Sequence, residues 1–247
     1  MSSVDGIPSK NKSGVVSGVG VLDKAVLILA FLSTDGPAAL AEVVEGTRLP
    51  RPTAYRLLSA LEVHHLVTRG GGRYSLGLRL LGWGNMVVAG AGLVEAARPV
   101  LAALRDATGE STQLYVKEGE ARVCVASVER ATGLRDTVPV GAVLPLELGS
   151  GGKVLFAWAE NEGRSLRIED VELDVIRNRG WAESVAEREA GVASVSAPVF
   201  GVSGDVSAAV SVSGPIARLG SNPGTRLAER VVAAAREIEG ALGSRRS

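Results

Sequence analysis

The sequence predicts an α+β protein of two domains, and three observations carry that prediction. Apolar residues follow helical spacing between residues 21 and 61, two-residue alternation predicts strands beyond residue 112, and basic residues cluster between residues 48 and 79. The length of 247 residues corresponds to about 1.6 domains at roughly 150 residues per domain. Hydrophobic residues at 46 % and charged residues at 22 % are ordinary for a globular core, so disorder is excluded for most of the chain.

The first domain is expected at residues 18–78, after a flexible tail of residues 1–17 rich in Ser, Lys, Gly and Asn. Apolar residues at i, i+4, i+7, i+8 and i+11 predict its first helix: Val21, Ala25, Ile28, Leu29 and Leu32. Asp35-Gly36-Pro37 ends that helix, and a second helix fits residues 38–45, with Gly46 in the turn that follows.

A third helix is expected to begin between Pro50 and Pro52, where a missing N–H is tolerated. Its predicted buried stripe is Ala54, Leu57, Leu58 and Leu61. Residues 67–69 and 73–76 then flank three glycines and predict a short β-hairpin. Three helices with a short turn before the third, followed by a hairpin, predict a winged helix-turn-helix, whose third helix enters the major groove of DNA.

The charge distribution agrees with this prediction. Residues 48–79 carry six arginines against the single acid Glu62, although the whole chain has 27 basic and 27 acidic residues. Such a segment favours a polyanion as partner, and a solvated basic face is the alternative. We expect Arg56 to read a base, and Arg69 and Arg73 to reach phosphates or the minor groove. The full set of expected contacts to double-stranded DNA is Arg51, Pro52, Thr53, Tyr55, Arg56, Ser59, Arg69 and Arg73.

A linker helix is expected at residues 79–92 and a second domain at residues 93–247. Strands fit residues 113–117, 122–129, 194–200 and 206–213, and they predict an antiparallel sheet. Helical spacing of apolar residues predicts one helix before these strands, around Leu101, and another after them, around Val231.

The glycine-rich segment 149–153 fits none of the enzymatic motifs that glycine-rich loops carry. A phosphate-binding loop needs glycine at position 147 and Ser or Thr at position 154, where Glu147 and Val154 stand. Ser150 and Lys153 have the spacing of penicillin-binding enzymes, but the SDN and KTG motifs are absent, and both histidines lie in the first domain. We therefore expect no catalytic residues, and a helix at 153–159 whose N-terminus could hold a small anion.

Serines alternate on two of the expected strands. Period two places Ser211 and Ser213 on one face of the strand at 206–213, and Ser194 and Ser196 repeat the pattern on the strand at 194–200. These hydroxyls could line a pocket, or they could form a solvated outer face.

Three segments resemble the IclR family of bacterial transcription regulators: LPRPTAYRLLSALEVHHLVTR, GGRYSLGLRL and GVASVSAPVFGVSGDVSAAVSVSGPI. The resemblance covers about residues 18–242. GVGVLDKA, GLRDTVPVG and EREAGVASVSAPV are similar to the NdgR-like actinobacterial branch, which is linked to amino-acid and especially leucine biosynthesis genes. The resemblance implies a winged helix, a linker helix and a GAF-like effector domain, in homodimers or homotetramers that bind a pseudo-palindromic operator.

The resemblance also implies a set of effector contacts. The family's glycine loop falls on Gly151 and Gly152, and its apolar wall on Leu134, Thr137 and Pro145. Strand positions fall on Ser194, Ser211 and Ser213, and an acidic position falls on Ser184 or its neighbour Glu183. The loss of an acid at Ser184 means that the family's organic-acid effectors do not transfer directly.

Three functions therefore remain open. The preferred one is a repressor or dual regulator whose operator affinity is changed by an amino acid or organic acid. The others are a metabolite-transforming enzyme with an appended DNA-binding module, and a DNA-binding protein whose second domain only oligomerises. One cysteine and two histidines predict no metal site, and no cofactor is expected. No apolar run approaches the ~20 residues of a membrane helix, so no membrane partner is expected and a cytoplasmic location is predicted.

Overall fold

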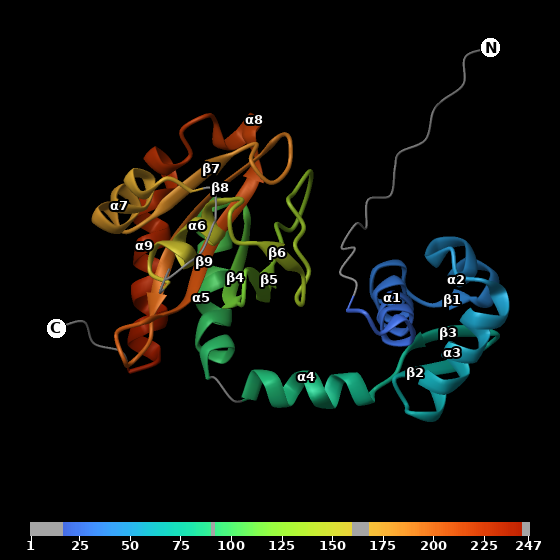
Figure 1. Cartoon of the computed structure of the whole chain (residues 1–247). Helices are drawn as coiled ribbons and strands as arrows, with labels where there is room; N and C mark the ends of the chain where they lie inside the picture. The colour runs from blue at the N-terminus through green and yellow to red at the C-terminus, as the bar shows by residue number, and fades with distance from the viewer. Residues whose placement is uncertain (1–16, 90–91, 160–167, 244–247) are drawn as a thin grey trace, which may run out of the picture. The chain divides into compact units, whose positions relative to one another are not determined.

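The computed structural model describes residues 17–89, 92–159 and 168–243, and the chain divides into two compact units, Met1–Val87 and Val88–Ser247 (Figure 1). Residues 1–16 of the expected tail lie outside the described residues. The expected linker helix is represented by α4 (Arg79–Ala89), which contains the division between the units, and residues 90–91 are not described.

The first unit is the predicted winged helix-turn-helix. It contains α1 (Gly20–Asp35), β1 (Ala38–Ala39), α2 (Leu40–Thr47), α3 (Arg51–Val63), β2 (Val67–Gly70) and β3 (Arg73–Leu76). The strands form an antiparallel sheet in the order β1-β3-β2. One core joins the three helices to this sheet, with Ile28, Leu58 and Tyr74 among its buried members.

The second helix was predicted two residues too early. Ala38 and Ala39 pair with Tyr74 and Arg73 as strand β1, and the Ala39 N–H donates to the Glu42 carboxylate at 2.5 Å. Gly46 does not form the following turn, because α2 continues through it to Thr47. A side chain at position 46 would overlap the Phe31 ring, so packing explains this glycine.

The second unit is built on one six-stranded antiparallel sheet in the order β6-β5-β4-β9-β8-β7. Its strands are β4 (Ser111–Glu118), β5 (Ala121–Val128), β6 (Val143–Pro145), β7 (Ala182–Val185), β8 (Val192–Phe200) and β9 (Val206–Pro215). Its helices are α5 (Leu93–Thr108), α6 (Ser150–Ala157), α7 (Asp170–Arg179), α8 (Ile216–Leu219) and α9 (Gly224–Ala241). The short elements β6, β7, α7 and α8 were not predicted.

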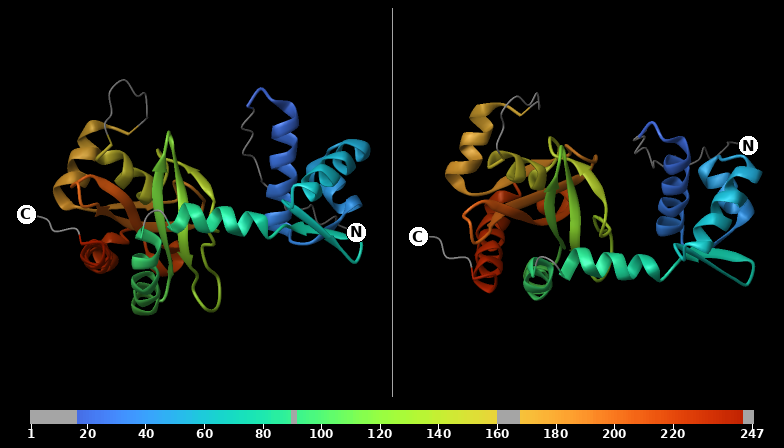
Figure 2. Two further views of the ribbon diagram at one scale, coloured as in Figure 1. Left: turned by 90° about the horizontal axis from the view of Figure 1, so that it is seen from below. Right: turned by 60° about the horizontal axis from the view of Figure 1, so that its bottom comes forward.

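Helices cover both faces of the sheet, as the GAF-like expectation requires (Figure 2). On one face α5 and α9 bury an apolar core that includes Leu101, Val210 and Ile238. On the other face α6 and α7 cover a second core that includes Tyr115, Phe156 and Ile176. The residues of this second face that are not apolar form the site described below.

Candidate functional site

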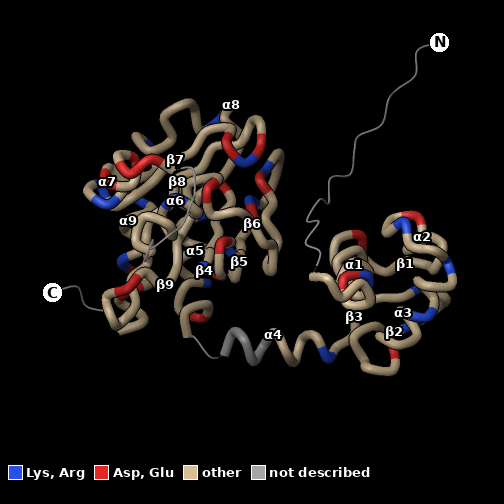
Figure 3. Tube along the Cα trace, viewed as in Figure 1, with Lys and Arg blue, Asp and Glu red and all other residues tan. Residues whose placement is uncertain are grey.

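The exposed side of α3 carries most of the expected DNA contacts. Arg51, Pro52, Tyr55 and Arg56 are exposed, whereas Thr53 and Ser59 are half-buried. Ala54, Leu58 and Leu61 anchor the helix in the core, while Leu57 is only half-buried. Basic residues gather on α3 and on the segment before it (Figure 3). The apolar core therefore holds one side of α3, and the other side presents basic and hydrogen-bonding groups to solvent.

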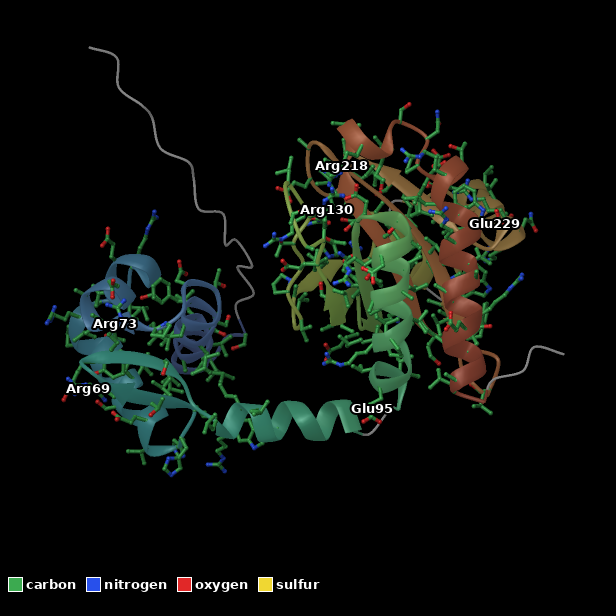
Figure 4. All side chains as sticks on the ribbon, turned by 180° about the vertical axis from the view of Figure 1, so that it is seen from behind. Arg69, Arg73, Glu95, Arg130, Arg218 and Glu229 are labelled. Carbon is green, nitrogen blue, oxygen red and sulfur yellow. The ribbon has the colours of Figure 1, made fainter. Side chains whose placement is uncertain are left out.

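The two arginines of the wing have different roles in the structure (Figure 4). The Arg69 guanidinium stacks on the ring of Tyr74, with its central carbon 5.3 Å from the ring centroid. Arg73 forms an ion pair with Glu42 at 2.9 Å and donates two hydrogen bonds to the Pro37 carbonyl. Arg73 thus links β3 to the start of α2. This structural role was not part of its expected role as a phosphate contact.

A polar pocket lies in the second unit between the sheet and the N-terminus of α6. Its volume is about 20 Å³, which holds one or two water molecules. It is lined by Tyr115, Arg122, Asp136, Gly149, Gly151, Ser184, Arg188, Glu189, Val192, Ser194, Ser211 and Ser213. Four of these residues are serines of β7, β8 and β9, brought together by antiparallel pairing that places Ser194 opposite Ser213 and Ser196 opposite Ser211.

The serine hydroxyls form one hydrogen-bonded network. Ser150, at the start of α6, lies 2.7 Å from the hydroxyls of both Ser194 and Ser196. Ser196 donates to Ser211 at 2.9 Å, and Ser184 lies 3.1 Å from Ser194. Because Ser150, Ser196 and Ser211 are buried, the alternative of a solvated outer face is wrong for these strands.

Charged side chains surround this network. Asp136 is buried and accepts from Arg188 at 2.7 and 2.8 Å. Burial lowers the pKa of Arg188, but the Asp136 carboxylate outweighs this effect, so the pKa is raised overall. Arg122 is 2 % exposed, lies over the Tyr115 ring and donates to the Pro145 and Leu148 carbonyls at 2.6 and 2.5 Å.

The glycine loop is held by a carboxylate from its own chain. One Glu187 oxygen accepts from the Gly149 N–H at 3.1 Å, and the other pairs with Lys153 at 2.6 Å. Lys153 is 8 % exposed and also pairs with Glu172 at 2.7 Å. The N-terminus of α6 therefore already faces a negative group.

Five of the nine expected effector contacts line the pocket: Gly151, Ser184, Ser194, Ser211 and Ser213. Gly152 does not line it, and a Cβ added at this position would overlap the Leu146 carbonyl. The apolar wall expected at Leu134, Thr137 and Pro145 is not there, since all three residues are exposed and lie outside the pocket lining. Polar and charged residues stand in place of such a wall.

Sequence reasoning missed the charged members of the lining. Arg122 had a usable signal, because it precedes Cys124 by two residues on a strand whose neighbours are apolar, and period two turns both to the same buried face. Asp136 and Arg188 lie in loops 52 residues apart, where no periodicity applies. Cys124 itself is a buried free thiol, and burial raises its pKa to about 12, as expected of a core residue.

Ser150 joins two neighbours, so its removal should weaken the whole network. We expect Ser150→Ala to reduce the free energy of unfolding of the second unit by about 1–3 kcal/mol, because Ser194 and Ser196 each lose a buried partner. Urea denaturation of the purified protein measures this effect. Ser207→Ala, on an exposed serine of β9, is the control and should change stability by less than about 0.5 kcal/mol. Equal stability of the two variants would show that the network contributes nothing.

Both units match protein families and relatives that are already known. A family model for the bacterial transcriptional regulator IclR C-terminal region matches residues 85–172 and 165–240, and the IclR helix-turn-helix domain model matches residues 21–71. The HTH-type transcriptional regulator BhcR of Paracoccus denitrificans is 28% identical, over 93% of this chain and 89% of its own length. The HTH-type transcriptional repressor AllR of Escherichia coli is 25% identical, over 96% of both chains.

A solved structure supports the fold. The crystal structure of an IclR homolog from Microbacterium hydrocarbonoxydans, complexed with 4-hydroxybenzoate, superposes with a TM-score of 0.72 at 22% identity, covering 91% of this chain and all of that one. Among the described residues, no helix is both long and apolar enough to cross a membrane, and no group of three metal-binding side chains occurs.

The two family models together span both units and cover most of the chain. The matched families and relatives are transcription regulators, which removes the interpretation of the second domain as an enzyme. A helix-turn-helix domain binds DNA, and the C-terminal domain is the family's effector domain. The chain is a DNA-binding transcription regulator that belongs to the IclR family.

Proposed function

We propose that the protein is a repressor that binds a pseudo-palindromic operator as a dimer, and that a small polar metabolite in the pocket of the second unit changes its operator affinity. The observation that carries this proposal is a buried, serine-lined pocket in a chain that also has a winged helix-turn-helix. In this scheme residues 18–78 bind DNA, residues 79–92 link the domains and residues 93–247 bind the effector. AllR, a repressor by name, supports the direction of regulation.

An exposed apolar surface on α1 supports a dimer formed by the DNA-binding halves. Val19, Leu22 and Val26 follow the spacing i, i+3 and i+7, and their side chains are 53–54% exposed. Neighbouring Val21 and Leu27 are also exposed. A monomer gains nothing from such a stripe, whereas a second copy of α1 could bury it.

The chemistry of the pocket lining supports a class of metabolite, and sequence similarity supports a class of target genes. Hydroxyls and guanidinium groups suit an amino acid or a related acid, and the lining must open to admit one, because the pocket as it stands holds only one or two water molecules. The segments GVGVLDKA and GLRDTVPVG are similar to the NdgR-like branch, so we propose amino-acid biosynthesis genes of the leucine type as targets and the cytoplasm as location. The 4-hydroxybenzoate bound to the Microbacterium protein is likewise a small acid.

Operator selection followed by ligand titration tests the proposal. Purified protein should enrich a pseudo-palindrome from random duplexes, and log affinity should fall with log salt by about 0.9 for each phosphate contacted. An effector should then change operator affinity about five- to 150-fold. Equal binding to random duplex would contradict the recognition of a specific operator. A second domain that only oligomerises would leave operator affinity unchanged by every amino acid and keto acid tested.

Arg56→Ala tests the recognition helix. If the exposed Arg56 reads a base, the variant should lose about 1–3 kcal/mol on the operator and discriminate less at one base position. Competition binding against operators with single substitutions measures both effects. Arg51→Ala, at the first residue of α3, is the comparison expected to weaken all sequences alike. Uniform loss in both variants would remove the base-reading role from Arg56.

A further inference from the structure

The pocket of the second unit is too small for a metabolite. Its volume of about 20 Å³ holds one or two water molecules. Besides the strands of the sheet, three segments line it: the loop between β7 and β8 (residues 186–191), the segment between β5 and β6, and the start of α6. Because the strands are fixed by their hydrogen-bonded pairing, a ligand can enter only if one of these segments moves.

The backbone of the β7–β8 loop is bonded to its surroundings at its base. The Ala186 N–H donates to the Val192 carbonyl at 2.8 Å, and the Ile216 N–H donates to the Gly191 carbonyl at 2.8 Å. Within the part of the chain that the structure describes, the N–H groups of residues 187–189 donate to no backbone carbonyl. Side chains therefore decide where the tip of this loop lies.

Two ion pairs join the tip to the other two segments. Glu187 pairs with Lys153 of α6 at 2.6 Å and accepts from the Gly149 N–H at 3.1 Å. Arg188 donates to both carboxylate oxygens of Asp136, between β5 and β6, at 2.7 and 2.8 Å. The side chains of Lys153 and Asp136 are 11% and 6% exposed. Ion pairs on the surface contribute little, whereas pairs with a buried partner are costly to break.

We propose that the β7–β8 loop is a gate on the pocket, held closed by the ion pairs Glu187–Lys153 and Arg188–Asp136, and that a ligand enters only after the loop has opened. Opening removes Arg188 and Glu189 from the pocket lining and leaves the paired strands in place. The proposal rests on the proposed effector function and states how the ligand reaches its site.

A cysteine in the pocket measures opening without any ligand. Cys124 is the single cysteine of the chain, so Ser211→Cys combined with Cys124→Ala gives one thiol, at a lining position that is 2 % exposed. Methyl methanethiosulfonate, a small neutral reagent, reacts with this thiol only while it is accessible. We expect labelling about 100-fold or more slower than in the urea-unfolded chain. Labelling as fast as in the unfolded chain would overturn the gate.

Removing either ion pair should open the gate. Glu187→Gln and Asp136→Asn, each in this thiol background, should raise the labelling rate about 10- to 100-fold, the value of a hydrogen bond to a charged group.

Glu189→Gln is the matched control. Glu189 lies on the same loop, lines the pocket and loses the same charge, but among the described residues its carboxylate pairs only with Arg188 of its own loop. Its labelling rate should stay within about threefold of the reference, because an exposed pair contributes little. If Glu187→Gln and Asp136→Asn label no faster than Glu189→Gln, the ion pairs do not hold the loop and the inference is wrong.

A second thiol separates gate opening from general loosening. Ala197→Cys, again with Cys124→Ala, places the thiol on the other face of the sheet, in the core under α5 and α9, at a position that is 1% exposed. Glu187→Gln should leave the labelling of position 197 unchanged. Equal acceleration at positions 197 and 211 would mean that the whole unit is destabilised, and would overturn the gate.

The gate and the proposed function fail in different ways. If a metabolite changes operator affinity but the thiol at position 211 does not respond to Glu187→Gln, the gate is wrong and the regulatory function stands. If the thiol responds as expected but no amino acid or keto acid changes operator affinity, the gate stands and the regulatory function is contradicted.

Discussion

Gly152→Ala is expected to destabilise the second unit by about 1–3 kcal/mol, although alanine is the better helix former. In an unobstructed helix this change would stabilise by roughly 1 kcal/mol. At position 152 of α6, however, the new Cβ would overlap the Leu146 carbonyl and the Arg122 guanidinium. The carbonyl belongs to the backbone and cannot rotate away, so the strain exceeds the gain in propensity. Thermal or urea denaturation measures the difference.

Gly151→Ala is the matched control, one residue earlier in the same helix. Its Cβ would lie 3.0 Å from the Tyr115 ring and 3.6 Å from the Ser196 hydroxyl, contacts that a small side-chain shift relieves. We expect less than about 1 kcal/mol of change in stability. Because Gly151 lines the pocket, this variant should instead bind the effector less tightly. If Gly152→Ala proved as stable as Gly151→Ala, the packing at α6 would differ from that described.

Local patterns predicted the elements that carry their own signal. The period-two serines of β8 and β9 fall on one buried face because alternation in a strand fixes the side of the sheet. The third helix and the hairpin were found from proline, glycine and apolar spacing. These features depend on neighbours in sequence, which the sequence displays directly.

Long-range packing determined what the sequence could not show. From the sequence alone Gly46 is typical of a turn, but in the structure the Phe31 ring leaves no room for a side chain at this position. Asp136 and Arg188 meet because two irregular segments fold over the same sheet face, and Arg73 finds Glu42 across the first unit. Each of these contacts joins residues at least 15 positions apart with no periodic signal, so tertiary structure was required to find them.

The largest functional effect is expected from charges placed on the exposed apolar stripe of α1. In the double variant Leu22→Glu and Val26→Glu, two carboxylates replace apolar side chains that a dimer would bury. Both positions are about half exposed in the single chain, so the fold of the first unit should persist. A dimer holds its second recognition helix at high effective concentration over the second half-site. Its loss should therefore weaken binding to the full operator about 10²- to 10⁴-fold, while half-site binding falls no further than it does in the charge-matched control described next.

Lys24→Glu provides the control that separates surface position from charge. Lys24 is exposed on α1 but does not belong to the apolar stripe. At 100° per residue, it lies about 160° around the helix from Leu22 and from Val26. This single substitution changes the net charge by as much as the double variant does, so electrostatic repulsion of DNA should be similar in both. Sedimentation velocity and titrations with full and half operators compare them. If the double variant sediments as wild type and binds the full operator as Lys24→Glu does, α1 is not the dimer contact, because a buried pair of carboxylates could not leave that interface intact.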